Sequence, residues 1–308
     1  MRFLITGGAG FLGSALANRL AASGHEVRVS DELSAGDSEN LDEKVLFTRG
    51  DVNDRPRLWT LLQDVECVYH LAARVSVPQS VLYPREYNAV NVGGTVSVME
   101  AMRDAGVKRV VLASSGAVYG AQEVQPLRET IVPHPDSPYA VSKLSAEYYV
   151  RTIGSLWGLE TVALRVFNAY GPGQPLPASH PPVISRFLRS AASQGSLVVH
   201  GNGTQTRDYV FISDVIDALT AAATARTVSQ RVINIGSGIA VSLNELVKTV
   251  SNVMGTELEP LYNNKERGGV MQMCADLTLA NKKLGYRARV SLPDGLSRTI
   301  ASDARFQS

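Results

Sequence analysis

The sequence has few cysteines, no excess of charge of either sign and no long apolar run. Its two cysteines, Cys67 and Cys274, are too few for a disulfide framework and lack the paired spacing of zinc ligands, so we expect a cytoplasmic location and no metal. Lysine and arginine (30) balance aspartate and glutamate (29), which argues against nucleic acid or an anionic membrane as the main partner. No stretch approaches the ~20 apolar residues of a membrane span.

The 308 residues are 44% hydrophobic, enough for one large domain or two modest ones. In the first half, short apolar runs alternate with longer helical patterns, which is typical of βαβ units. Expected strands are 3–6, 26–30, 45–48, 67–69, 109–113 and 161–166, and expected helices are 12–22, 55–62, 86–105 and 138–156. The sequence therefore predicts an α/β fold with a Rossmann-type, doubly wound parallel sheet.

A proline-rich stretch at 171–177 and 181–182 is incompatible with helix and marks a boundary. A smaller C-terminal domain begins there, and it is interleaved with the first because residues 232–235 are again a buried strand. We expect a first domain of residues 1–170 plus about 208–238, and a second of residues 171–207 and 239–308 that binds the substrate.

A cluster of glycines lies between the first expected strand and the first expected helix. Glycines allow a tight turn and a close approach of the backbone, and a helix N-terminus offers N–H groups to a pyrophosphate. The strand before the cluster and the helix after it favour a dinucleotide site over a plain loop. The candidate cofactor ligands in this segment are Gly7, Gly10, Phe11, Leu12 and Gly13.

Asp31 ends the second expected strand, 18 residues after Gly13. A carboxylate there accepts both adenosine ribose hydroxyls of NAD and repels the extra phosphate of NADP, so NAD is the predicted cofactor. Asp51 and Val52 follow the third expected strand and are candidates for the adenine edge, although a simple strand-end turn also explains them.

Tyr139 and Lys143 are spaced i, i+4, which places both side chains on one face of a helix. A tyrosine titrates near ~10, and a neighbouring ammonium and an oxidised nicotinamide would favour its phenolate form. Ser115 follows the strand at 109–113, at the edge where doubly wound sheets bind ligands. Ser115 could then hydrogen-bond a substrate hydroxyl while Tyr139 removes its proton, and Ser114 is the alternative serine.

Several motifs occur in a consistent order along the chain. They are the glycine loop, His70-Leu71-Ala72-Ala73, Ser114-Ser115, Tyr139-x-x-x-Lys143, Asn168 to Gln174, Arg207-Asp208-Tyr209 and Asn234-Ile235-Gly236. From about Phe3 to Gly285 the chain resembles the extended short-chain dehydrogenase/reductase family, specifically its nucleotide-sugar epimerases.

The resemblance implies further contacts. Leu71, Ala72 and Ala73 would line the cofactor, and Lys143 would also hold the nicotinamide ribose. Asn168 and Arg207 would contact the diphosphate of a nucleotide sugar, with Arg267 as a second cation. It also implies a homodimer in which helices 86–105 and 138–156 pack together. His70 is interpreted as a packed histidine at a strand end.

The family catalyses several reactions that begin by oxidising C4 of the sugar. Its 4,6-dehydratases have an Asp-Glu pair where this chain has Gly116-Ala117, and its uronate decarboxylases favour a glutamate at the position of Ala117, so neither reaction is expected. Its reductive members use NADPH, which Asp31 disfavours. The remaining reaction is 4-epimerisation of a UDP-hexose, UDP-glucose or UDP-galactose. Two other substrates stay open: an N-acetylated hexose, and UDP-glucuronate, whose carboxylate Arg186 would bind. A non-catalytic protein that senses NAD is the alternative function. Val270 replaces the acid that relatives place on the nucleotide ribose.

Overall fold

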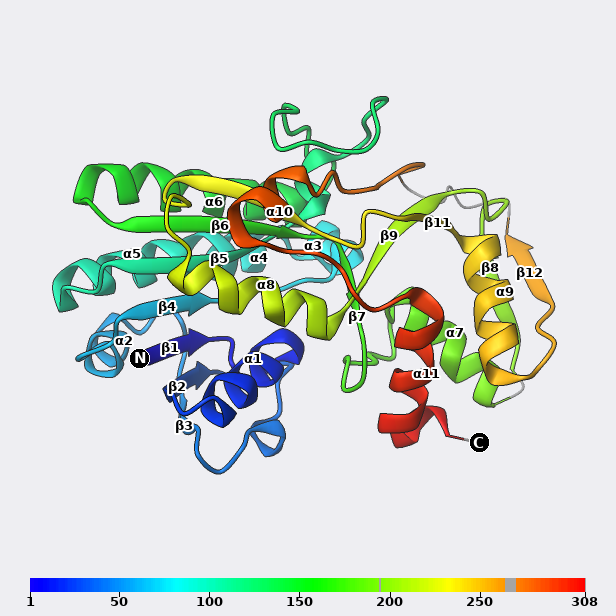
Figure 1. The fold of residues 1–308 in the computed structure, drawn as a ribbon, viewed down its shortest axis with the longest axis horizontal. Helices are drawn as coiled ribbons and strands as arrows, with labels where there is room; N and C mark the ends of the chain where they lie inside the picture. Colours follow the sequence, from blue (N-terminus) through cyan, green and yellow to red (C-terminus); the bar gives the residue numbers. More distant parts are fainter. Residues whose placement is uncertain (194, 264–269, 308) are drawn as a thin grey trace.

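The computed structural model describes residues 1–193, 195–263 and 270–307, and its main feature is a large parallel sheet beside a smaller lobe (Figure 1). The seven strands follow the order β10-β6-β5-β4-β1-β2-β3, and each neighbouring pair is parallel. The strands are β1 (Arg2–Thr6), β2 (Glu26–Asp31), β3 (Leu46–Arg49), β4 (Cys67–His70), β5 (Arg109–Ser115), β6 (Glu160–Val166) and β10 (Arg231–Ile235). The order reverses between β1 and β4, which confirms the doubly wound sheet.

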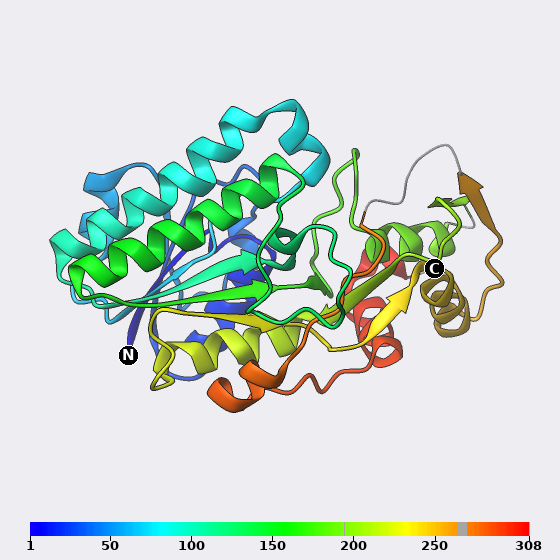
Figure 2. The ribbon, with the colours of Figure 1, turned by 90° about the horizontal axis from the view of Figure 1, so that it is seen from above.

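Helices cover both faces of this sheet (Figure 2). One face is covered by α1 (Phe11–Ala22) and α8 (Ile212–Thr224), the other by α2 (Arg55–Leu61), α5 (Gly94–Ala105) and α6 (Pro138–Trp157). The alternation of β1 explains the layers, because Phe3 and Ile5 belong to one apolar cluster and Leu4 to the other. Within the part of the chain that is described, no helix is both long and apolar enough to cross a membrane.

Among the described residues, the smaller lobe is built from short strands and three helices. Strands β7 (Asn168–Tyr170), β9 (Thr206–Phe211) and β11 (Ala240–Ser242) form one sheet in the order β11-β9-β7, and β8 (Leu197–His200) pairs with β12 (Pro260–Asn263). The helices are α7 (Val183–Ala192), α9 (Leu243–Met254) and α11 (Leu292–Ser302). The chain returns to the large sheet at β10, and α10 (Thr278–Leu284) packs against β10 and α8.

The helix expected at 86–105 is interrupted. The structure has α3 (Val77–Leu82), α4 (Pro84–Tyr87), a π-helical turn at 88–93 and then α5. In the π turn, the Asn91 amide donates to the Arg74 carbonyl (3.0 Å) and to the Ser142 hydroxyl of α6 (2.9 Å). A wide turn of this kind accommodates a polar side chain that bonds outside its own helix, and hydrophobic periodicity does not reveal it.

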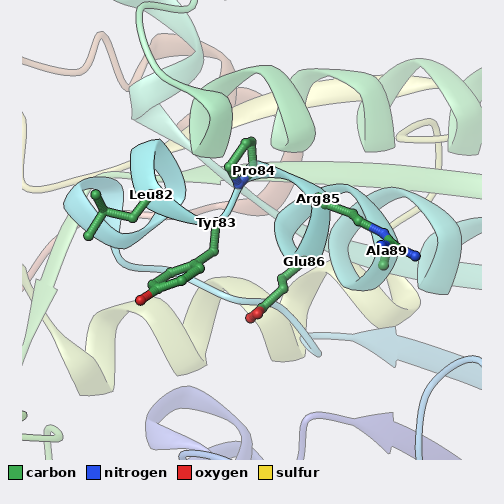
Figure 3. Close-up of a pocket in the computed structure, with 6 residues that line it drawn as sticks. All are labelled: Leu82, Tyr83, Pro84, Arg85, Glu86 and Ala89. Carbon is green, nitrogen blue, oxygen red and sulfur yellow. The ribbon is translucent and has the colours of Figure 1, made fainter.

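Exposed apolar side chains gather on α3 and on the adjacent helix α6. Beside them, residues at the end of α3 and in α4 line an open hollow of about 400 Å³ (Figure 3). We call this region the α3–α6 face, and its exposed apolar residues are Val77, Val81, Leu82, Tyr83, Val141 and Tyr148.

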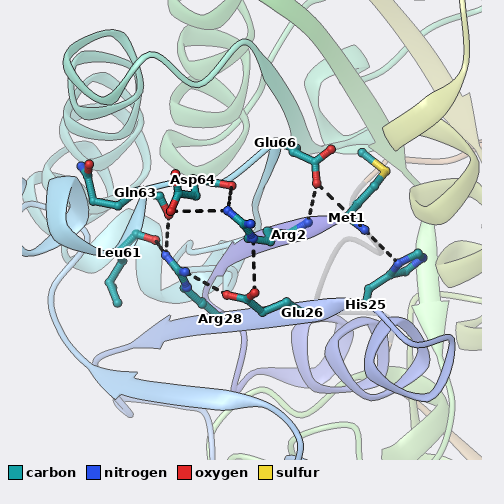
Figure 4. A network of polar contacts seen from close by, with 9 residues as sticks. All are labelled: Met1, Arg2, His25, Glu26, Arg28, Leu61, Gln63, Asp64 and Glu66. Atoms are coloured by element: carbon teal, nitrogen blue, oxygen red, sulfur yellow. Dashed lines mark hydrogen bonds and ion pairs between the residues drawn. The ribbon is translucent and has the colours of Figure 1, made fainter.

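The amino ends of β1 and β2 form a polar edge on the side of the sheet opposite the glycine loop (Figure 4). Arg2 pairs with Glu26 and Asp64, each at 3.4 Å, and Arg28 pairs with Glu26 at 2.8 Å. Most of these side chains are exposed, so each pair stabilises the fold by no more than about 1 kcal/mol.

His70 is a buried link between two strands and a helix, as its interpretation as a packed histidine requires. Its Nδ1 lies 2.7 Å from the Thr6 hydroxyl of β1, and its Nε2 lies 2.9 Å from the Thr95 hydroxyl of α5. Burial lowers the pKa of His70 to about 3, and the charge of Lys143 acts in the same direction.

This pKa predicts acid sensitivity. Below pH ~6.5 the unfolded chain gains a proton at His70, whereas the folded protein stays neutral there until about pH 3, so stability falls as the pH drops. Between pH 7.5 and 5.0 the unfolding free energy from urea titration should fall about 2 kcal/mol more in the wild type than in His70→Gln. Equal losses in the two proteins would contradict the assignment.

Candidate active site

The loop that joins β1 to α1 is packed too closely for side chains. A Cβ on Gly13 would lie 2.2 Å from the Gly7 oxygen, and a Cβ on Gly7 would lie 2.5 Å from the Ala72 nitrogen. Gly7 also has a φ of +70°, which favours glycine. Gly10 precedes α1, whose first N–H groups have no partner within the helix. This backbone cradle fits a pyrophosphate.

Asp31, at the end of β2, lies against the glycine loop. Its carboxylate accepts hydrogen bonds from the Ala9 N–H (3.1 Å) and the Leu33 N–H (2.8 Å). The residue is only partly buried, and each carboxylate oxygen has a second lone pair with which to accept a ribose hydroxyl. The position and the remaining acceptor capacity both suit the adenosine end of a dinucleotide.

The other candidate cofactor residues follow β3 and β4. Asp51 is exposed, and its Oδ1 accepts from the Asn53 N–H (2.8 Å), which is the strand-end turn that the sequence also allowed. Val52 is buried and packs against Gly94. Leu71 donates its N–H to the Thr6 carbonyl (3.0 Å). Ala72 and Ala73 continue from there, so this segment borders the glycine loop.

Tyr139 and Lys143 lie in the first turns of α6. The helix begins here because Ser137 accepts a hydrogen bond from the Ala140 N–H (3.2 Å) and Pro138 occupies the first helical position. The Tyr139 side chain lies close to Ser115, and its ring meets Tyr87 edge-on at 6.4 Å. Lys143 is 6% exposed, and its Nζ donates to the Ala113 carbonyl (2.8 Å).

Burial acts on the two groups in opposite directions. It raises the pKa of Tyr139, and Tyr87 adds to that effect while the neighbouring Ser115 side chain opposes it. It lowers the pKa of Lys143 to about 8, against the charge of Glu147, which favours the ammonium. At neutral pH and with no ligand bound, Tyr139 is therefore a neutral phenol. Lys143 beside it is an ammonium whose pKa lies only a little above the pH of the solution.

The structure separates the two candidate serines. Successive residues of a strand face opposite sides, so Ser114 and Ser115 point apart. The Ser115 hydroxyl lies close to Tyr139 and accepts from the Ala117 N–H (3.1 Å). Ser114 is buried and donates its hydroxyl to the Glu147 carboxylate. The sequence offered Ser114 as the alternative to Ser115, and the engagement of its hydroxyl with Glu147 favours Ser115 as the serine beside Tyr139.

Sequence reasoning missed a buried ion pair behind this site. Arg165 of β6 donates to Glu147 of α6 through Nε (2.9 Å) and Nη2 (2.7 Å), and its guanidinium stacks on the Tyr119 ring at 4.6 Å. The Tyr119 hydroxyl in turn donates to Asn234 (2.7 Å). An arginine inside an apolar strand was the available signal, since a charge buried in a sheet needs a partner.

Strands β7 and β9 present the predicted substrate residues. Asn168 donates to the Asp208 carbonyl (3.2 Å), and Arg207 donates to the carbonyls of Thr206 (2.8 Å) and Val270 (2.6 Å). The buried Asp208 carboxylate accepts four hydrogen bonds, from the Ser237 N–H and hydroxyl and from the N–H groups of Gly238 and Ala275. Asp208 therefore fixes β9, and with it Arg207.

Arg186 of α7 lies near Tyr209 of β9. Each favours the charged form of the other, although burial lowers the pKa of Arg186 and raises that of Tyr209. The Arg186 Nε and the Tyr209 hydroxyl are buried and have no hydrogen-bond partner among the residues that the structure describes. The two groups offer donors to a polar group of a ligand. Arg267 lies outside the described residues.

This fold and site define a dinucleotide-dependent enzyme, and family comparison agrees. Residues 3–236 match the model of the NAD dependent epimerase/dehydratase family. The chain belongs to this family, within the extended short-chain dehydrogenases/reductases, and its cofactor is NAD.

Individual relatives match over almost the whole chain. A UDP-glucose 4-epimerase of Mycolicibacterium smegmatis is 37% identical, over 97% of both chains. The structure of a UDP-glucose 4-epimerase of Thermotoga maritima with UDP-glucose superposes with a TM-score of 0.94 at 35% identity, over 98% of both chains. The protein MoeE5, in complex with UDP-glucuronic acid and NAD, superposes with a TM-score of 0.89 at 37% identity, also over 98% of both chains.

The close packing at Gly13 predicts a selective loss of cofactor binding. In Gly13→Ala the new methyl group forces Gly7 away, and overpacking of about 1–3 kcal/mol should weaken NAD binding about 5- to 150-fold. Gly24→Ala is the matched control, since Gly24 has a φ of +80° but nothing within 4 Å of its Cβ position. Titration by calorimetry measures both, and equal affinities for NAD would contradict the cradle.

Proposed function

We propose that this protein is an NAD-dependent isomerase that inverts C4 of a UDP-hexose of the UDP-glucose/UDP-galactose type, in carbohydrate metabolism. The observation that carries the proposal is the placement of Tyr139 next to Ser115 and one helical turn before the buried Lys143, at the sheet edge that also holds the glycine loop. The names of its relatives point to the same reaction.

The cofactor would be held along the carboxyl ends of the strands. NAD, when bound, supplies a hydride acceptor that returns the same hydride later. Its pyrophosphate would lie on Gly7, Gly10, Phe11, Leu12 and Gly13. Asp31 would bind the adenosine ribose, Asp51 and Val52 the adenine, and Leu71, Ala72 and Ala73 would line the path toward Lys143.

The chain's own residues would move the proton. Tyr139, as phenolate, would take the proton of the sugar C4 hydroxyl as C4 becomes a carbonyl, and would give it back when the carbonyl is reduced. Ser115 would hydrogen-bond the same oxygen, and Lys143 would stabilise the phenolate and hold the nicotinamide ribose. Inversion requires only that the keto sugar turns before its reduction.

The segment after Ser115 supports epimerisation over elimination. A Cβ on Gly116 would lie 3.2 Å from ring atoms of Phe167, so a side chain at this position would displace the ring. Ala117 offers no ionisable group. Elimination of water needs a further acid and base, and these two positions supply neither.

The smaller lobe would bind the nucleotide sugar. Asn168, Arg207 and Arg267 would contact the diphosphate, and the guanidinium of Arg207 suits that role because it forms charge-assisted hydrogen bonds. We propose the domain division given by the sequence, residues 1–170 plus about 208–238 for NAD and 171–207 with 239–308 for the sugar nucleotide, with the short sheet of β7, β9 and β11 at the junction of the two. Buried free thiols at Cys67 and Cys274 support the cytoplasm as its location.

A second candidate substrate is UDP-glucuronate. The unpartnered Nε of Arg186 and the Tyr209 hydroxyl are donors that a sugar carboxylate would satisfy. A relative in complex with UDP-glucuronic acid also matches this chain at 37% identity.

Substitution of the proposed base tests the mechanism. Tyr139→Phe should bind NAD with unchanged affinity and lose at least about 100-fold in epimerisation, because the phenolate oxygen is gone. NMR of products from UDP-glucose, UDP-galactose, UDP-glucuronate and UDP-N-acetylglucosamine measures turnover and identifies the sugar. Retained activity would exclude Tyr139 as the base, and no epimer from any of the four would favour an NAD sensor.

We also propose the homodimer that the sequence predicts, in which helices 86–105 and 138–156 pack together, and we place the α3–α6 face in its interface. Its exposed apolar side chains lie on helices, and burial of such a patch is the usual reason for its presence on a protein surface.

Light scattering after gel filtration tests the dimer. The chain mass is 33.1 kDa, and the wild type should elute at twice that mass. Tyr148→Glu should produce monomers, because it places a charge on the buried face. Leu46→Glu is the control, since Leu46 is equally exposed but lies on the edge strand β3. A monomeric wild type, or a dimeric Tyr148→Glu, would reject this interface.

A further inference from the structure

Glu147 joins three elements behind the candidate base. It lies one helical turn after Lys143 on α6 and is 1% exposed. It accepts a hydrogen bond from Ser114 of β5 and two from Arg165 of β6. Arg165 neutralises the carboxylate, so the pair is stable in the core. An apolar side chain at 147 could fill the same space, so the charge itself requires an explanation.

Lys143 is surrounded by groups that give its charge little support. Burial favours the neutral amine, and the Ala113 carbonyl is its hydrogen-bond acceptor. The ionisable groups on the elements around it are Tyr139 and Glu147 of α6, His70 of β4, Tyr87 of α4, Tyr119 next to β5, and Arg165 of β6.

Of these groups, Glu147 is the carboxylate that favours the ammonium. His70 stays neutral, and burial keeps Tyr87 and Tyr119 protonated. The charged residues of α5 are engaged at its far end, where Arg103 stacks on Trp157 and Glu100 pairs with Arg55. The ionisation of Lys143 therefore depends on Glu147, whose charge is partly offset by the paired Arg165.

We propose that Glu147 is a positioning residue that keeps Lys143 in its ammonium form and thereby sets the alkaline limit of the reaction. The link to activity rests on the proposed function, because the ammonium is what stabilises the Tyr139 phenolate. The effect of Glu147 on the ionisation of Lys143 does not depend on the proposed function, because it is a property of the folded chain alone.

The geometry gives Glu147 a second effect on the same site. Lys143 is tied to the Ala113 carbonyl, and Ser114, the next residue of β5, is tied to Glu147. These two bonds fix the end of β5 against α6, and Ser115 then meets Tyr139. One carboxylate thus supports both the charge and the placement of the groups around the substrate hydroxyl.

The test separates charge from structure with two variants. Glu147→Gln with Arg165→Gln removes both charges together, so no unpaired charge stays buried. Glu147→Asp keeps the charge but shortens the side chain and disturbs the paired geometry. Lys143 is titrated by the 13Cε shift of labelled lysine, without NAD or sugar, and is assigned with Lys143→Met. Thermal unfolding of each protein is recorded in parallel.

In the double variant the pKa of Lys143 should fall, by less than loss of the carboxylate alone would give because Arg165 is removed with it, and the alkaline limb of kcat/KM should move to lower pH by the same amount. In Glu147→Asp both should stay near the wild type, even where the melting temperature falls. The proposal would be overturned if the pKa of Lys143 were unchanged in the double variant. It would also be overturned if the pKa of Lys143 changed across the variants in step with their melting temperatures. If Lys143 shifts but no protein epimerises any sugar, the proposed function fails and this inference stands.

Discussion

Parallel pairing of the central strands is the constraint on which the site depends. In a parallel sheet every carboxyl end lies at one edge, so residues far apart in the sequence meet there. The register determines how far each strand reaches. Thr6 of β1 pairs with His70, and His70 pairs with Leu112 of β5, so β5 continues for three more residues past the end of β4. This extension carries Ser115 to Tyr139, while the shorter β1 leaves room for the glycine loop.

Much of this arrangement could be predicted because it depends on local signals. The glycine loop follows from the backbone conformation and close packing that only glycine permits, and the start of α6 follows from Ser137 and Pro138. The six strands expected in the first half all occur, with ends displaced by one or two residues. The spacing of Tyr139 and Lys143 needed only the period of a helix.

What sequence reasoning could not supply depends on contacts between distant segments. The choice between Ser114 and Ser115 is decided by which side of β5 faces Glu147, and the π turn is held by bonds from Asn91 to Arg74 and Ser142. Neither has a periodic signature. Arg165 was visible as a charge in an apolar strand, but its partner lies on another element, 18 residues away.

The net charge of the chain, close to zero, does not reveal the charges inside the site. Lys143 is buried and Tyr139 is half-buried, and the loss of water favours the uncharged form of each. The ionised pair therefore forms only where neighbouring charge compensates the loss of water. Within the described residues that charge is held in single groups such as Glu147, and it leaves no trace in a net charge of +1. The proposed base, Tyr139, is a phenol until opposite charge arrives beside it and so does not act on arbitrary hydroxyls, which restricts the proposed proton transfer to the fully assembled site.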